Sequence, residues 1–134
     1  MQHIPSETIP NTENSFLPSG PQKISNSQAG GRKVTLKMTV GDGKSEVFCC
    51  KFDPEDRYLA VGYGDGMCRI YNNTTGKLSY TLSSLSLDDD KPITAVGWRP
   101  VSSTLKTANV LVTCSADGSL KHYHATSGKL LHSR

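Results

Sequence analysis

One stretch of this chain, from Glu46 to Leu82, is repeated from Ile93 to His132, and this repeat limits the fold more than any other feature. Both copies begin with the spacing apolar-x-x-apolar-x-aromatic-x-Pro, in Val47–Pro54 and in Ile93–Pro100. Further on, the copies share an Asp-Gly pair, a tyrosine and a Gly-Lys-Leu triplet: Asp65-Gly66 and Asp117-Gly118, Tyr71 and Tyr123, Gly76-Lys77-Leu78 and Gly128-Lys129-Leu130. A self-match at this period indicates a repeat architecture, in which each unit stacks on its neighbour to bury its apolar face.

Each copy predicts short β-strands, because its apolar runs are short and are separated by turn residues. Two strands are predicted in each copy, at Val47–Phe52 and Tyr58–Gly62, and at Ile93–Arg99 and Val110–Cys114. A third strand follows each Asp-Gly pair. Glycine adopts positive φ in such hairpin turns and aspartate bonds to nearby backbone amides, so we assign a structural role to Asp65, Gly66, Asp117 and Gly118. The second copy has extra residues at Val101–Ala108, which we predict to form a surface loop.

This pattern resembles the WD-repeat family of β-propellers, through the inner-strand motif, the Asp-Gly-x-apolar-Arg/Lys-x-aromatic stretch and the Thr/Ser-Gly-Lys turn. The resemblance covers about Val34 to the C-terminus. It departs from the family where Tyr71-Asn72 and Tyr123-His124 replace the terminal Trp-Asp. The resemblance implies an all-β fold, with two four-stranded antiparallel blades of a propeller that form an incomplete ring. It also implies that outer strands lie at Val34–Val40 and at Lys129–Ser133.

The sequence divides into a leader and a repeat region. Residues 1–31 hold four of the seven prolines and few apolar residues, which predicts a disordered tail. Residues 32–134 form the WD-repeat region, with repeats at about 46–82 and 93–132. Two blades cannot cover all four of their own faces. We therefore expect the chain to be a fragment or truncated form of a larger propeller, with the remaining blades supplied by missing sequence or by other copies.

Composition narrows the class of partner and the compartment. No apolar run approaches the roughly 20 residues that a membrane-spanning helix needs, and Met1–Gln22 lacks the pattern of a secretory signal. We therefore expect a cytoplasmic or nuclear protein that is not secreted and has no membrane partner. The net charge is only +3, and the basic residues are dispersed along the sequence without a basic run. We therefore expect no nucleic-acid partner.

The residues that could carry chemistry give weak signals. His122 and His124 alternate on a predicted strand and so share a face, as a metal pair requires, but no third ligand is evident nearby. Cys50 occupies the repeat position of Val96, which predicts a buried apolar side chain. The tract Asp88–Asp90 lacks the glycine of a calcium-binding loop and is interpreted as a solvated loop. No metal or cofactor is expected.

We predict a non-catalytic scaffold for protein–protein interaction. Loops of unequal length on a regular frame carry specificity, which predicts a partner-binding rim at Ser45, Glu46, Asp88, Asp89, Asp90 and Lys91, beside the Asp-Gly turns. Phe52 and Trp98, the aromatic residues that end the inner-strand motif, are predicted to be equivalent core anchors. The alternative is a metal- or ligand-dependent enzyme on a propeller scaffold, which rests on four residues: His122, His124, Asp117 and Cys114. A stoichiometric metal in the purified protein would favour it.

Overall fold

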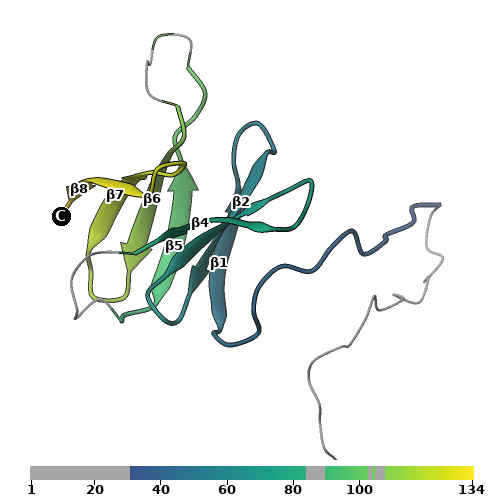
Figure 1. Ribbon diagram of the computed structural model, residues 1–134, viewed down its shortest axis with the longest axis horizontal. Coiled ribbons are helices and arrows are strands. Elements are labelled where there is room, and N and C mark those ends of the chain that lie inside the picture. Colours follow the sequence, from purple (N-terminus) through teal and green to yellow (C-terminus); the bar gives the residue numbers. More distant parts are fainter. Residues whose placement is uncertain (1–30, 84–89, 103, 105–107) are drawn as a thin grey trace, which may run out of the picture. The chain divides into compact units, whose positions relative to one another are not determined.

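The computed structural model describes residues 31–83, 90–102, 104 and 108–134, and residues 38–134 form one compact unit. Within the described residues, all regular structure is β-strand, arranged in two four-stranded antiparallel sheets (Figure 1). Sheet one has the order β1 (Val47–Phe52), β2 (Tyr58–Tyr63), β3 (Cys68–Asn72) and β4 (Leu78–Leu82). Sheet two repeats this order with β5 (Ile93–Trp98), β6 (Val110–Ser115), β7 (Leu120–His124) and β8 (Lys129–Ser133). The predicted fold of two four-stranded antiparallel blades is confirmed.

The strand register shows why the repeat matters. Phe52 pairs with Leu59 in sheet one, and Trp98 pairs with Leu111 in sheet two. The β-bulge near the start of the inner strand also recurs, between Val47 and Cys49 in one sheet and between Ile93 and Ala95 in the other. Equivalent residues of the two copies therefore occupy equivalent places in the two sheets.

One predicted strand is wrong. Val34–Val40 alternates apolar and polar residues as an outer strand does, but the structure gives it no strand pairing. The partner of such a strand would be the third strand of a preceding sheet, and the described residues contain none. Lys129–Ser133, the other predicted outer strand, pairs with β7 as expected because its partner strand is present.

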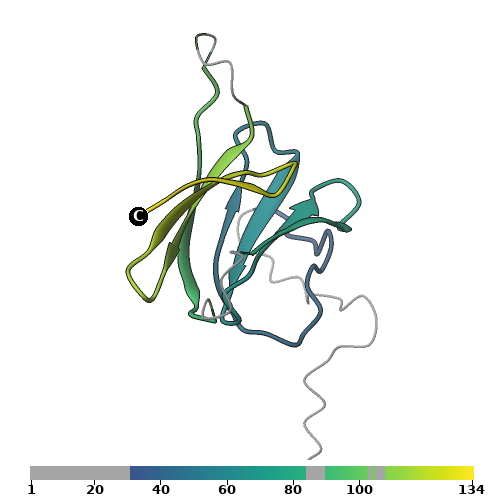
Figure 2. The same cartoon turned by 60° about the vertical axis from the view of Figure 1, so that its left-hand side comes forward.

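The two sheets lie side by side, with β5 next to β1 and β2 (Figure 2). Their facing sides enclose the larger hydrophobic cluster, to which sheet one contributes residues of β2, β3 and β4, and sheet two contributes residues of β6, β7 and the turn after β7. Its buried members are Ala60, Cys68, Ile70, Leu82, Leu111, Tyr123 and Ala125. This cluster is the shared core, because each sheet supplies the cover for the other.

Trp98 joins the two sheets directly. Its side chain packs against the shared core, and its indole Nε1 donates a hydrogen bond to the Lys51 carbonyl oxygen at 3.0 Å. At the other end of the same contact, Gly62 allows close approach, since a Cβ there would lie 2.6 Å from both the Cys49 Sγ and the Ile93 Cγ2. The Cys49 thiol also lies 3.4 Å from the Ile93 carbonyl oxygen, to which it donates.

The outer face of sheet one corrects two predictions. Phe52 was predicted to be a core anchor like Trp98, but 50% of it is exposed. Cys50 was predicted to be buried, and it is exposed as well. Both residues stand on the face of β1 that has no neighbouring sheet among the described residues, whereas the equivalent positions of β5 face sheet one. The strand position of each residue was predicted correctly. Its burial was not, because the equivalent face of β5 has another sheet against it and this face of β1 has none in the part of the chain that is described.

We predict that the shared core dominates the stability of residues 38–134. Leu111→Ala should lower the free energy of unfolding by about 3 kcal/mol, because Leu111 is fully buried in the cluster. The matched control is Leu131→Ala, at a leucine that is 48% exposed, and it should change stability by less than about 0.5 kcal/mol. Urea unfolding followed by circular dichroism measures both, and equal losses would contradict the assignment of the core.

Candidate interaction surface

Four short segments meet at one end of the two sheets and form a rim (Figure 1). The rim comprises residues 41–46 before β1, 64–67 between β2 and β3, 90–92 before β5 and 116–119 between β6 and β7. We call this set the acidic rim, because it holds five carboxylates and two lysines: Asp42, Glu46, Asp65, Asp90 and Asp117, with Lys44 and Lys91.

Backbone hydrogen bonds tie the segments of the acidic rim together in the same way in both repeats. The Gly64 amide donates to the Glu46 carbonyl oxygen at 2.8 Å, and the Ala116 amide donates to the Pro92 carbonyl oxygen at 2.9 Å. The residue that precedes each inner strand is thereby fixed to the Asp-Gly turn beside it. In sheet two the Ser115 hydroxyl adds a longer bond, of 3.4 Å, to the Lys91 carbonyl oxygen.

The turn aspartates hold their turns through side-chain acceptors. The Asp65 Oδ1 accepts from the Met67 amide at 3.0 Å, and the Asp117 Oδ1 accepts from the Ser119 amide at 2.7 Å. Gly66 and Gly118 have φ of 78° and 88°, a region that an L side chain rarely adopts. Both Asp-Gly pairs therefore form tight turns, in which the glycine adopts positive φ and the aspartate accepts a hydrogen bond from the amide two residues further on.

Asp65 also forms an ion pair with Arg69, whose repeat counterpart is Lys121. The Arg69 guanidinium donates to the Asp65 Oδ2 at 2.7 Å and lies over the Tyr63 ring, 4.4 Å from the ring centroid. Burial alone would raise the pKa of Asp65, but the hydrogen bonds from Arg69 and the Met67 amide outweigh it and lower the pKa below 3.8. At Asp117 the pKa is also lowered, first by the Ser119 amide and least by the charge of Lys121.

The predicted partner-binding residues fall partly on the acidic rim. Glu46 is exposed and Ser45 is half-buried, both immediately before β1. Asp90 and Lys91 form an exposed ion pair at 3.2 Å. Asp88 and Asp89 lie outside the described residues. Whether these side chains bind a partner stays a prediction.

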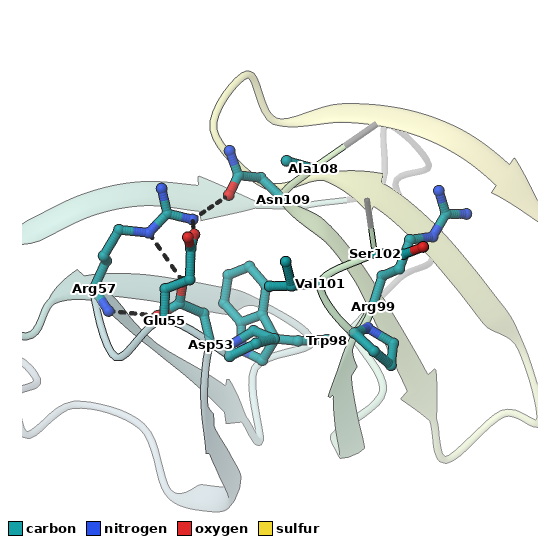
Figure 3. Close-up of a pocket in the computed structure, with 11 residues that line it drawn as sticks. Asp53, Glu55, Arg57, Trp98, Arg99, Val101, Ser102, Ala108 and Asn109 are labelled. Carbon is teal, nitrogen blue, oxygen red and sulfur yellow. Dashed lines mark hydrogen bonds and ion pairs between the residues drawn. The ribbon is translucent and has the colours of Figure 1, made fainter. Parts of the chain in front are cut away.

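The opposite rim contains a groove that the sequence did not reveal (Figure 3). Trp98 and Asp53 both line this groove. Asp53 is only 3% exposed, and its carboxylate accepts hydrogen bonds from the Arg57 and Tyr58 amides at 2.6 and 2.8 Å. The Arg57 guanidinium crosses to sheet two and donates to the Asn109 Oδ1 at 2.9 Å. In the alignment of the two copies, Arg99 occupies the position of Asp53. No pattern shared by the two copies therefore predicts this arrangement.

The residues that would support the enzyme alternative are not brought together. The His124 Nδ1 lies 2.7 Å from the Ser127 Oγ in the turn after β7, while His122 lies beside His132 with ring centroids 6.0 Å apart. Asp117 belongs to the acidic rim. In the part of the chain that the structure describes, no three His, Cys, Asp or Glu side chains are grouped as a metal site requires.

The cysteines are free thiols that sit in different surroundings. Burial raises the pKa of Cys68 to about 12, so this side chain is a neutral member of the shared core. No helix formed by the described residues is long and apolar enough to cross a membrane.

Comparison with known proteins settles the family. The model of the Anaphase-promoting complex subunit 4 WD40 domain matches residues 29–101, more than half of the chain, and the model of the WD domain, G-beta repeat matches residues 79–124. The chain belongs to the WD-repeat family. The two sheets are therefore two WD-repeat blades, blade one (β1–β4) and blade two (β5–β8), as the sequence motif implied.

Individual relatives share the blade but are much longer. WD repeat-containing protein 1 of Mus musculus is 33% identical over 79 residues, which cover 59% of this chain and 13% of the relative. Retinoblastoma-binding protein homolog 5 of Caenorhabditis elegans is 32% identical over 84 residues, which cover 63% of this chain and 16% of the relative. The chain therefore spans less than a fifth of the length of these relatives.

Solved structures show the same fold. A chain in the Crystal Structure of Mitotic Checkpoint Complex superposes with a TM-score of 0.56 at 18% identity, covering 69% of this chain and 26% of that one. The computationally designed Ika8 protein gives a TM-score of 0.56 at 24% identity, covering 71% of this chain and 26% of that one.

We predict that Asp65→Asn lowers the free energy of unfolding at pH 7 by about 1 kcal/mol, because it leaves Arg69 without its carboxylate in a partly exposed setting. The folded-state pKa of Asp65 lies below the ordinary value of 3.8, so its contribution to stability is present above pH 3.8 and is lost as the pH falls through the lower, folded-state pKa. The gap between wild type and variant should therefore narrow in unfolding experiments carried from pH 7 to pH values below 3.8.

Asp117→Asn is the matched control at the equivalent turn of blade two. It keeps an acceptor for the Ser119 amide and breaks no arginine pair, so it should cost less than Asp65→Asn at pH 7. Equal losses at pH 7, or a gap for Asp65→Asn that does not narrow as the pH falls below 3.8, would show that the ion pair with Arg69 is not the source.

Proposed function

We propose that this chain is a non-catalytic scaffold whose acidic rim binds a protein partner that presents basic side chains. The observation that carries the proposal is the charge of the rim. Its described residues hold five carboxylates and two lysines, on a chain whose net charge is +3. Asp65 is paired with Arg69 and Asp90 with Lys91, which leaves three carboxylates, Asp42, Glu46 and Asp117, against Lys44. Acid is thus concentrated where the loops are, and such a patch steers and orients a partner of opposite charge.

The rim is preorganised for this role. The same amide-to-carbonyl bond holds the rim at both blades, from Gly64 to Glu46 and from Ala116 to Pro92. A surface whose backbone is already fixed loses little conformational entropy on binding, which favours affinity. The acidic charge also repels phosphate groups, which supports a protein partner over a nucleic acid at this surface.

Membership of the WD-repeat family supports the scaffold role. A structural neighbour also supports it, because that chain comes from the Mitotic Checkpoint Complex, which its title describes as a complex. We also propose that the chain belongs to a larger propeller and acts in the cytoplasm or nucleus. The length of its relatives supports the first of these: in each of two, the match spans less than a fifth of the relative. The enzyme alternative would be favoured by stoichiometric metal in the purified chain.

Charge reversal tests the role of the rim. The double variant Glu46→Lys/Asp90→Lys should lose bound partners several-fold in affinity capture with quantitative mass spectrometry, because two exposed carboxylates of the rim become cations. The matched control, Glu55→Lys/Asp56→Lys, reverses two exposed carboxylates at the opposite rim and should keep those partners.

Circular dichroism spectra equal to wild type for both double variants exclude unfolding as the cause. Partner binding should also weaken as salt is raised, since screening acts on exposed charges. An unchanged set of bound proteins in Glu46→Lys/Asp90→Lys, or an equal loss in the control, would refute the proposal.

A further inference from the structure

The Asp-Gly pairs of the chain share one local geometry and lie on the acidic rim rather than on a sheet face. They are Asp42-Gly43, Asp65-Gly66 and Asp117-Gly118. In each pair the aspartate Oδ1 accepts from the amide two residues further on, at 3.1, 3.0 and 2.7 Å in that order. The glycines have φ of 67°, 78° and 88° in the same order. The pairs therefore differ in their surroundings and not in their local conformation.

An Asp-Gly pair can rearrange without an enzyme. The glycine amide nitrogen attacks the carboxyl carbon of the aspartate, the amide proton leaves with the carboxyl hydroxyl as water, and a cyclic succinimide forms. Water then opens the ring at either carbonyl, which gives aspartate back or gives isoaspartate, in which the chain runs through the side-chain carbon. Because glycine has no side chain to shield its nitrogen, the rate depends on whether the backbone can bring that nitrogen to the carboxyl carbon.

In two of the pairs a hairpin holds the glycine nitrogen. The Gly66 amide donates to the Tyr63 carbonyl oxygen at 3.4 Å, and the Gly118 amide donates to the Ser115 carbonyl oxygen at 3.0 Å. A strand enters and a strand leaves each of these turns. Ring closure there requires that a backbone hydrogen bond break and that a turn fixed at both ends distort.

The carboxyl groups of the same two pairs are also kept ionised. Burial raises the pKa of Asp65 but is outweighed by the hydrogen bond from Arg69, and the Ser119 amide lowers the pKa of Asp117, so both values lie below 3.8. Ring closure expels the carboxyl hydroxyl and so uses the protonated form. These hydrogen bonds make that form rarer at neutral pH.

The Asp42-Gly43 pair lacks the restraint of a hairpin. Both residues are exposed, and they lie before β1 in a segment that no strand precedes within residues 31–83. Among the residues that the structure describes, none accepts a hydrogen bond from the Gly43 amide. The Gly43 nitrogen can therefore turn toward its carboxyl group without first breaking a backbone hydrogen bond.

We propose that Asp42-Gly43 is the site at which the folded chain converts spontaneously to isoaspartate, while the hairpins protect the pairs at Asp65 and Asp117. The conversion lengthens the backbone of the acidic rim by one carbon and leaves the carboxylate attached directly to the Cα of residue 42. It alters the segment that leads to Glu46. The proposal concerns the chemistry of the pair and does not depend on whether the rim binds a partner.

Isotope labelling of the full chain tests the proposal, because the pairs lie on separate tryptic peptides that span residues 38–44, 58–69 and 107–121. The chain is incubated at neutral pH in water enriched in oxygen-18, with a circular dichroism spectrum that stays native, and is then digested in ordinary water. Ring opening inserts one heavy oxygen, which mass spectrometry detects, and electron-transfer fragmentation identifies isoaspartate. Label should enter at Asp42 at least about fivefold faster than at Asp117, the factor that one retained backbone hydrogen bond gives.

Two controls make the result specific to the fold. In urea the chain has no hairpins, so the peptides should take up label at similar rates. The Asp42→Glu variant should show no label in its peptide, since closure to the larger glutamate ring is much slower. Equal rates in the folded chain, faster labelling at Asp65 or Asp117, a difference that persists in urea, or label in the Asp42→Glu peptide would each overturn the proposal.

Discussion

The contact between the two sheets is the interaction on which the rest of the described structure depends. A four-stranded sheet has two faces and no second layer of its own, so its apolar residues need a neighbouring sheet as cover. Here Trp98 supplies an anchor at one end of the contact and Gly62 allows close approach at the other. Leu111 and Ile70 are fully buried members of the shared core between the two sheets. The acidic rim spans both blades, so the position of its two halves relative to each other depends on this contact.

Much of the fold follows from the sequence, because a repeat with fixed turn chemistry leaves few alternatives. The spacing of the inner-strand motif placed β1 and β5, and the Asp-Gly pairs placed the turns in which Gly66 and Gly118 adopt positive φ. These are local requirements, and each is met by residues close together in the chain. The family resemblance rested on the same local features and is confirmed by the family models.

Burial and long-range contacts could not be predicted in this way. Phe52 and Trp98 occupy the same repeat position but differ in exposure, because only Trp98 faces another sheet within the described chain. The bond from Arg57 to Asn109 joins residues that are far apart in sequence, and Asp53 has an arginine as its repeat counterpart, so no pattern announced the groove beside them. Val34–Val40 has the alternation of a strand but lacks a partner strand, and alternation alone does not supply one.

The central claim is that the two blades fold as one unit through the Trp98 contact, and Trp98 is the chain's single tryptophan. Urea unfolding should be followed on one sample by Trp98 fluorescence and by far-ultraviolet circular dichroism. The account predicts emission at shorter wavelength in the folded chain than in the unfolded one, and a fluorescence transition that coincides with the loss of β-structure. Emission typical of a water-exposed indole while the circular dichroism spectrum is native, or a fluorescence change well before the loss of β-structure, would contradict it.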